Sequence, residues 1–236
     1  MHMKGFARIL AITALLAAGN AGAASLFVRP TTVVFAPGSS AATVTVTNSG
    51  DAPVTAQLRM FSWSQSDNED KLDPTQAIAA SPPMSSIPPG QSQTIRLVRT
   101  AKAPVLKEES YRLYVDEILD RKATESASAI QIQLRYSVPV FLLVNATDTA
   151  TLAATAQLTN GSVAFEATNT GKAHAQLSKV EAVFADGSSR ALVAGLLGYV
   201  LPEKSRHWAW VLPAGTPGPP KKLRVLVNGQ ELLLDL

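Results

Sequence analysis

Residue types that support catalysis or metal binding are sparse in this 236-residue chain. It has no cysteine, and of its three histidines only His174 and His207 lie beyond residue 2. A zinc or copper site of the usual His/Cys kind would therefore need unusual carboxylate support. No G-x-S-x-G elbow, phosphate-cradling glycine loop or H-E-x-x-H motif occurs, and nothing distinguishes one of the many serines or aspartates as a triad member. We predict neither an enzyme nor a bound metal or cofactor.

Two other segments contain residue types that bind ligands. Acidic residues gather in one short segment, at Asp67, Glu69, Asp70 and Asp73. They lack the spacing and central glycine of an EF-hand, so a solvated hairpin loop is the favoured interpretation. Trp208 and Trp210 lie on one face of an expected strand and could stack on sugar rings, although paired aromatics in a β-sandwich more often belong to its core.

The stretch SAIQIQLRYSVPVF, residues 128–141, alternates apolar and polar side chains. The apolar positions are Ile130, Ile132, Leu134, Tyr136 and Val138, and the polar ones are Gln131, Gln133, Arg135 and Ser137. Alternation with a period of two predicts a β-strand with one buried face. The pattern lasts about twice as long as a typical strand of about 5–6 residues. The simplest interpretation is that the whole apolar row packs into the chain's own core.

The rest of the pattern predicts an all-β protein made of two tandem immunoglobulin-like β-sandwich domains. Short Val/Thr-rich runs alternate with clusters of Gly, Pro, Asn and Asp, and no convincing amphipathic helix follows the first residues. The stretch VTVTNSGDAPVTAQL, residues 44–58, is echoed by FEATNTGKAHAQLSKV, residues 165–180. Asn48 and Asn169 are 169 − 48 = 121 residues apart, which is about one sandwich domain. We interpret both as turn formers with positive φ.

Residues 1–23 are typical of a secretory signal peptide. Lys4 and Arg8 precede an apolar run over residues 9–18, and a small-residue stretch ends at Ala23. Removing both basic residues changes the charge from 21 − 18 = +3 to 19 − 18 = +1, so nucleic-acid binding loses its compositional support. No uninterrupted apolar run reaches about 18 residues, so we expect an exported protein with no membrane insertion.

The mature chain is expected to divide into domains at residues 24–146 and 147–236. Polar residues interrupt the apolar pattern in the segment 145–150, which we interpret as the hinge. Without cysteine, each domain must be stabilised by core burial rather than by disulfides. Near the C-terminus, Asn228-Gly229 separates two apolar runs, and this pair is the strongest short signal for a β-hairpin.

Three segments resemble the periplasmic pilus-assembly chaperones of the PapD-like superfamily. They are SWSQ…SPPMSSIPPGQSQTIRLVR (residues 62–99), EESYRLYVDEI (108–118) and IQIQLRYSVPVF (130–141). The resemblance covers nearly all of the first domain and is closest to the archaic, spore-coat-associated branch. The second domain matches only loosely, through its β character and LGYVLP, residues 197–202.

The resemblance implies a binding role for the long strand. In this family it completes the unfinished sandwich of a pilus subunit, so Ile130, Ile132 and Leu134 are expected to cover the subunit's core, whereas Val138, Val140 and Leu142 stay in this chain's own core. The best-known members also hold the subunit's terminal carboxylate with an arginine and a lysine. Alignment on Phe35 and Phe141 places Thr32 and Pro139 at those positions, so the usual basic pair is missing. The candidates to replace it are Arg112 and Arg135 jointly, with Arg29 as a third.

The function expected from the resemblance is that of a periplasmic chaperone. It would bind pilus or fimbrial subunits by donor-strand complementation and deliver them to an outer-membrane usher. The alternatives are a structural or adhesive sandwich component of a surface fibre, and a carbohydrate-binding module using the two tryptophans. The sequence leaves open which subunit is bound and whether the free chaperone caps its edge by self-association.

Overall fold

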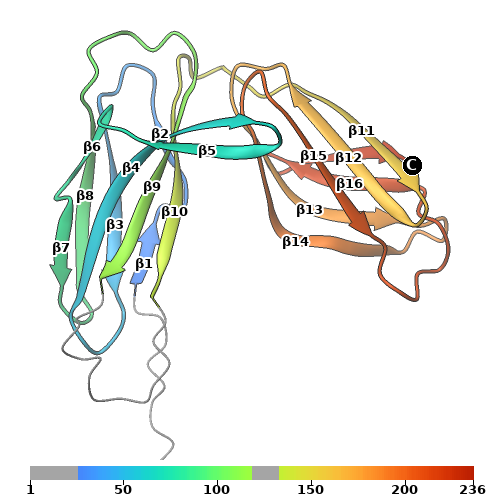
Figure 1. The fold of residues 1–236 in the computed structure, drawn as a ribbon, viewed down its shortest axis with the longest axis horizontal. Helices are drawn as coiled ribbons and strands as arrows, with labels where there is room; N and C mark the ends of the chain where they lie inside the picture. Colours follow the sequence, from blue (N-terminus) through green and yellow to red (C-terminus); the bar gives the residue numbers. More distant parts are fainter. Residues whose placement is uncertain (1–25, 119–132) are drawn as a thin grey trace, which may run out of the picture.

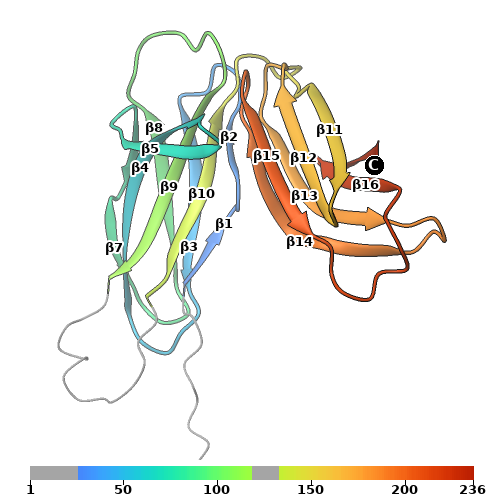
Figure 2. The same ribbon diagram turned by 45° about the vertical axis from the view of Figure 1, so that its right-hand side comes forward.

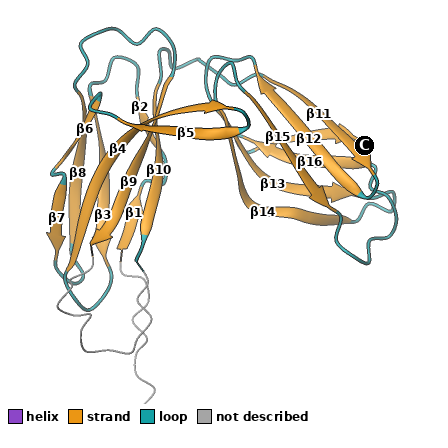
Figure 3. Cartoon of the chain, viewed as in Figure 1, coloured by secondary structure: helices purple, strands orange, loops and turns teal. Residues whose placement is uncertain are grey.

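The computed structural model describes residues 26–118 and 133–236, and this part of the chain consists of strands, turns and loops (Figure 3). Two bodies, each built from two sheets, follow one another along the chain (Figure 1). The prediction of two tandem β-sandwich domains is confirmed. Within the described ranges there is no apolar helix of membrane-spanning length. The signal peptide predicted over residues 1–23 lies outside the described residues.

The first domain packs a four-stranded sheet against a six-stranded one. The smaller sheet has the order β1 (Leu26–Arg29), β3 (Ala41–Asn48), β8 (Ser92–Arg99), β6 (Ile78–Ser81). The larger sheet has the order β2 (Val33–Phe35), β10 (Arg135–Leu142), β9 (Glu109–Ile118), β4 (Val54–Ser66), β5 (Glu69–Pro74), and β7 (Met84–Ile87) also pairs with β4.

The second domain packs a three-stranded sheet against a four-stranded one. The first has the order β11 (Leu152–Thr159), β12 (Ser162–Asn169), β15 (Ser205–Val211). The second has the order β14 (Ser189–Val200), β13 (Ala175–Val183), β16 (Lys222–Val227), β17 (Gln230–Asp235). The boundary predicted between residues 146 and 147 lies in the link between β10 and β11.

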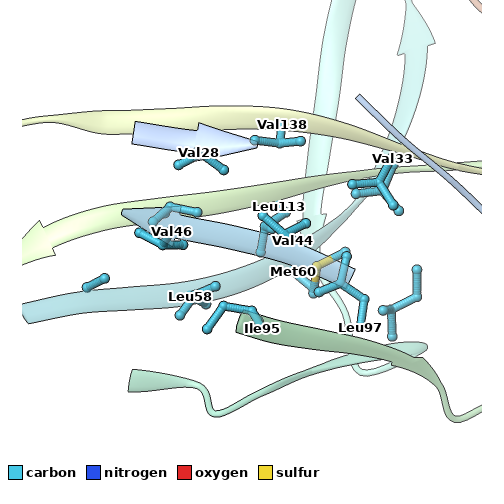
Figure 4. Close-up of a cluster of buried hydrophobic side chains, with 14 of the residues drawn as sticks. Val28, Val33, Val44, Val46, Leu58, Met60, Ile95, Leu97, Leu113 and Val138 are labelled. Atoms are coloured by element: carbon cyan, nitrogen blue, oxygen red, sulfur yellow. The ribbon is translucent and has the colours of Figure 1, made fainter. Parts of the chain in front are cut away.

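The core of the first domain forms because alternate residues of each strand face inward. In β3, Val44 and Val46 are buried while the intervening threonines are not. Figure 4 shows these side chains meeting those of the facing sheet, among them Leu113 and Val138. Val138, Val140 and Leu142 all belong to this buried cluster, as the sequence predicted for the second half of the long strand.

The C-terminal hairpin forms as the Asn-Gly pair predicted. β16 and β17 pair in antiparallel register, with Val227 opposite Gln230. The two turn residues, Asn228 and Gly229, have φ values of 49° and 82°. Positive φ at both central residues is the requirement of the hairpin turn whose twist matches that of the flanking strands.

The two echoed asparagines have a role in addition to the one expected. Asn48 and Asn169 are fully buried, and neither has positive φ. The Nδ2 of Asn48 donates to the carbonyls of Ala52 and Ile87, at 2.7 and 2.9 Å. That of Asn169 donates to those of Ala173 and Val200, at 2.8 and 3.0 Å. The expected positive φ was wrong. Each Oδ1 does close a local turn by accepting the N–H of the glycine two residues on, Gly50 at 2.9 Å and Gly171 at 3.0 Å. Each Nδ2 also satisfies buried backbone carbonyls of a loop and a neighbouring strand.

The glycine after Asn169 is required for the same construction. Gly171 has an ordinary φ, but a Cβ there would lie 2.4 Å from the backbone nitrogen of Thr151. Its own N–H donates to the Oδ1 of Asn169 at 3.0 Å. The similar sequences in the two domains therefore reflect the same local structure. In each, a buried asparagine forms hydrogen bonds to the backbone of the loop that follows it.

We expect Asn48→Ala and Asn169→Ala each to destabilise their domain strongly. Each buried polar group left without a partner costs about 1–3 kcal/mol, and each substitution leaves more than one. Thr47→Ala is the matched control, since its hydroxyl bonds only to Ser92 at an exposed site. Urea unfolding monitored for each domain tests this. A loss at Asn48 no larger than that of the control would contradict the assigned role.

Candidate strand-docking site

Two strand edges are left unpaired on the same side of the first domain. β10 pairs with β9 along its whole length, but β2 pairs only with Val140–Leu142 of it. Among the described residues, the outer edge of β10 from Arg135 to Pro139 therefore has no partner strand. The neighbouring β1 pairs with β3 alone. Figures 1 and 2 both show β1 beside β10, and the Tyr136 hydroxyl donates to the Leu26 carbonyl between them.

The chain leaves these edges open because its first strand changes sheets. β1 ends at Arg29 in the small sheet, and β2 begins at Val33 in the large one. β2 therefore covers only the end of β10. Pro139 lies in the uncovered part, where a residue without an N–H is tolerated because the strand is an edge. The outer edges of β1 and β10 are therefore open beside each other, up to the point where β2 covers β10.

Of the predicted donor residues, Leu134 lies just before the uncovered part of β10. Ile130 and Ile132 lie outside the described residues. Leu134 is partly buried, and its carbonyl accepts a hydrogen bond from the Glu117 N–H at 3.0 Å. It has the same parity as Tyr136 and Val138, whose side chains face the core. The insertion of these three apolar residues into a partner stays a prediction.

Arg135 lies at the start of β10 and binds the nearly buried carboxylate of Asp116. Its Nε donates to Oδ1, while Arg59 donates to Oδ2 through Nε and Nη2 at 3.0 and 2.8 Å. Burial disfavours the charged carboxylate, but the hydrogen bonds from Arg135 and Arg59 outweigh it and hold the pKa of Asp116 below its ordinary value. The Arg135 guanidinium also lies 5.1 Å from the ring centre of Tyr114. This group of two cations and one anion keeps a net positive charge beside the open edge.

Arg112 lies opposite Pro139, but its side chain contacts the domain interface. Its guanidinium is 3.7 Å from the ring centre of Trp63 and 5.4 Å from that of Tyr199 in the second domain. Asp70 is 4.0 Å away, and only 13% of the Arg112 side chain is exposed. The pKa of Arg112 lies below its ordinary value because burial disfavours the charge. Arg112 is thus a cation held between aromatic rings of two domains.

The structure does not bring the two predicted anchor residues together. Arg135 lies opposite Asp116, and Arg112 is four residues away along β9, a separation of about 13 Å. Each guanidinium has its own acidic partner. Arg29 is exposed at the end of β1. Since Val140 pairs with Val33, Pro139 and Thr32 are next to each other in register. The two positions that the alignment gave to the basic pair therefore lie side by side.

The hairpin β4–β5 reaches the second domain, which sequence reasoning missed. Its turn residues Asp67 and Asn68 have φ values of 54° and 61°. The Asn68 side chain donates to the His207 carbonyl and accepts from the His207 N–H, both at 2.9 Å. Asp70 accepts from Arg206 Nη1 at 2.8 Å. The acidic segment is a hairpin as expected, but it is not simply solvated, and the described residues hold no acidic or histidine group suited to a metal.

Two further contacts join the domains beneath this hairpin. Gln65 is buried, donates to the Tyr199 carbonyl at 2.9 Å and accepts from the Leu201 N–H at 3.0 Å. Glu108 accepts hydrogen bonds from both the backbone N–H and the ring Nδ1 of His174, the latter at 2.8 Å. A small apolar cluster fills the space between them: Trp63, Phe141, Tyr199 and Leu201. No sequence pattern marks these residues, because they come from β4, β10 and the end of β14, which are far apart in the sequence.

The tryptophan pair of the second domain packs into its core. Trp208 and Trp210 are partly buried, and their rings stack on Phe165 with centroid distances of 5.5 and 6.5 Å. The core interpretation of these residues is confirmed, and the carbohydrate-binding module loses the feature on which it rested.

The two open edges and the tandem sandwiches agree with a sequence comparison. Residues 25–143 match the family model described as pili and flagellar-assembly chaperone, PapD N-terminal domain. The chain belongs to this family. It is a pilus-assembly chaperone, and the match spans the domain that has the two open strand edges. A search of curated protein sequences finds no match.

Solved structures with the same fold are chaperones and chaperone complexes. The chain is similar to one in the CsuC–CsuE chaperone–tip adhesion subunit complex from archaic Csu pili of Acinetobacter baumannii, with a TM-score of 0.65, 23% identity and coverage of 90% of this chain and 98% of that one. For the SafA pilin–SafB chaperone complex of Salmonella enterica the TM-score is 0.62 and the identity is 17%, with 90% of this chain and 96% of that one covered. For the Escherichia coli chaperone DraB the TM-score is 0.56 and the identity is 22%, with 90% of this chain and 96% of that one covered. These similarities show the fold, and the closer placement in the spore-coat-associated branch stays a prediction.

We expect the hairpin contacts to restrict motion between the two domains of the chaperone. The double variant Asn68→Ala/Asp70→Ala removes hydrogen bonds to Arg206 and His207, including charge-assisted ones worth about 1.5–3 kcal/mol each. The chain has no cysteine, so two introduced cysteines, one on β6 and one on β17, can carry spin labels. Pulsed electron resonance should show a broader distance distribution in the variant.

The control is Glu69→Ala/Lys71→Ala, which removes an exposed ion pair of 2.6 Å within the same hairpin. It should leave the distribution as in the native chain. Identical distributions for the two double variants would show that the hairpin does not fix the domains.

Proposed function

We propose that this chaperone acts in the periplasm by adding its open β10 edge to exported pilus or fimbrial subunits whose immunoglobulin-like fold lacks a strand. The observation that carries the proposal is the unpaired edge of β10 from Arg135 to Pro139, beside the open edge of β1. Free backbone N–H and C=O groups on a strand edge are an aggregation hazard, and a protein keeps them mainly where pairing is its function. The role is one of binding and requires no catalytic step.

In this proposal the long strand binds in two ways. Its backbone supplies the missing ladder of hydrogen bonds, and Ile130, Ile132 and Leu134 fill the gap in the subunit's core. The alternation of the strand fixes the register, because a shift of one residue would turn every apolar side chain away from that gap. The CsuC–CsuE and SafA–SafB structures are complexes of a chaperone with a pilus subunit or pilin, which supports the same kind of partner here.

Release and delivery follow from the same geometry. No nucleotide is needed if a neighbouring subunit replaces the chaperone strand with its own, and an outer-membrane usher would be the place of exchange. Co-expression with candidate subunits tests the proposal. A chaperone forms a soluble 1:1 complex and is absent from the finished fibre, whereas a structural or adhesive component would be found in the fibre.

We expect replacement of Ile130 and Ile132 by Asp to abolish subunit capture while the free chaperone stays folded. A large aliphatic side chain contributes about 1.5–3 kcal/mol when buried, so the two losses weaken binding by a factor on the order of 10² or more. The matched control, Gln131→Asp/Gln133→Asp, adds the same charge to the opposite face of the strand and should still capture the subunit. If the first variant alone unfolds on thermal melting, its isoleucines belong to the chaperone's own core.

The carboxylate anchor is proposed with Arg112 and Arg135 as separately tested candidates. An arginine can hold a carboxylate through two parallel N–H bonds, worth about a factor of ten or more in affinity. Capture of a native subunit and of one with an amidated C-terminus is compared for Arg112→Ala and Arg135→Ala. Removing the true anchor weakens capture of the native subunit and abolishes the difference between the two subunit forms.

Arg59→Ala is the control, since Arg59 shares Asp116 with Arg135 but lies on β4, away from the open edge. The amidation comparison also separates anchoring by Arg112 from its contacts at the domain interface, because loss of those contacts would weaken both subunit forms equally. Unchanged capture by both arginine variants would reject the assignment and leave Arg29 as the candidate.

A further inference from the structure

A pocket of about 330 Å³ opens at the end of the first domain nearest the second, the upper end in Figure 1. Its walls come from the ends of β2, β8 and β10 and from the loop after β8. Three of the lining residues, Phe35, Leu142 and Val105, belong to the hydrophobic core or pack against it. The volume is at the lower end of the range of small-molecule sites. The pocket is separate from the open edges of β1 and β10, because β2 covers the edge of β10 from Val140 onward.

Arg99 is the charged residue that lines this pocket, and its hydrogen-bonding capacity is largely unused. Its side chain is only 13% exposed, and the Nε has no hydrogen-bond partner among the described residues. Its ion-pair partner, Glu109, is 3.7 Å from Nη2, which is too long for a hydrogen bond. A buried guanidinium N–H without an acceptor is costly to keep unless something binds it.

A neighbouring tyrosine binds the carboxylate oxygen of Glu109 that does not face Arg99. The Tyr111 hydroxyl donates to Oε2 of Glu109 at 2.7 Å. Burial, followed by the hydrogen bond to Glu109, raises the pKa of Tyr111 above its ordinary value, so the phenol keeps its proton and this bond persists. Glu109 is therefore held by Tyr111 through Oε2, and Arg99 has only the 3.7 Å ion pair of its Nη2 with Oε1.

We propose that this pocket binds a carboxylate carried on a small apolar group, with Arg99 as the residue that holds the carboxylate. A guanidinium matches a carboxylate through two parallel N–H bonds, and the aliphatic and aromatic walls suit an apolar substituent. One arginine with an acidic residue nearby suits a single negative charge better than the double charge of a phosphate, which would cost more to remove from water. The apolar C-terminal residue of a peptide and a short fatty acid share this chemistry.

The experiment uses N-acetyl-leucine and pentanoate as probes of the two sources, titrated into the full mature chain and followed by NMR. The Nε–Hε signal of Arg99 should shift with either probe that binds. N-acetyl-leucinamide, which has the apolar group but no charge, should bind at least about tenfold more weakly than N-acetyl-leucine. Binding of one probe but not the other identifies the source, and binding of both supports the shared chemistry.

Two variants make the test specific to this arginine. Arg99→Gln should weaken binding by a factor of about ten or more, and Arg99→Lys, which keeps the charge but loses the fork, should also weaken it. Arg96→Gln is the matched control, because Arg96 is exposed on the same strand. Signal dispersion reports whether each variant is folded, and the lysine variant serves if the glutamine variant is not. Equal binding by the native chain and Arg99→Lys, equal binding by the amide, or shifts confined to other residues would overturn the proposal.

Discussion

The unequal lengths of β2 and β10 determine the form of the whole first domain. β2 pairs with three residues of β10, whereas β9 pairs with all eight. Outward-facing backbone groups on the uncovered stretch have no partner strand within residues 26–118 and 133–236, so they are left to water or to another strand. Because β1 has already crossed to the other sheet, the same side of the sandwich presents a second open edge. The binding role follows from this incomplete pairing rather than from any cluster of reactive side chains.

An open edge is useful only if its surroundings are held in place. The large sheet is continued by the β4–β5 hairpin, whose tip bonds to the backbone and side chains of β15. Below it, Arg112 lies against rings from both domains, and Gln65 satisfies two backbone groups of the second domain. The large sheet that contains the open edge of β10 thus also carries the contacts to the second domain. A partner bound at β10 would meet two domains whose relative position is already restricted, which lowers the entropic cost of binding.

Patterns with a short period were predictable from the sequence, and contacts between distant strands were not. Alternation gave the core positions Val138, Val140 and Leu142, and Asn228-Gly229 gave its hairpin, because both depend on neighbouring residues. The repeat around Asn48 and Asn169 was visible, but its cause was only partly predicted, since the carbonyls that these side chains satisfy include those of Ile87 and Val200, far away in sequence. Asn68, Glu108 and His174 carry no pattern at all, and only the packing of two domains reveals them.

The proposed carboxylate anchor places its positive charge beside the positions of the missing basic pair rather than at them. Thr32 and Pro139 occupy the place where positive charge was expected, yet the neighbouring strand carries Arg112 directly opposite Pro139, and Arg135 lies four residues earlier on the same strand as Pro139. Both are already bound to acidic side chains, so a partner's carboxylate must compete with Asp70 or Asp116. The competition is unequal. Asp116 is nearly buried and held by two arginines at hydrogen-bonding distance, whereas Asp70 is more exposed and lies 4.0 Å from Arg112. A new carboxylate would therefore displace a weaker ion pair at Arg112 than at Arg135.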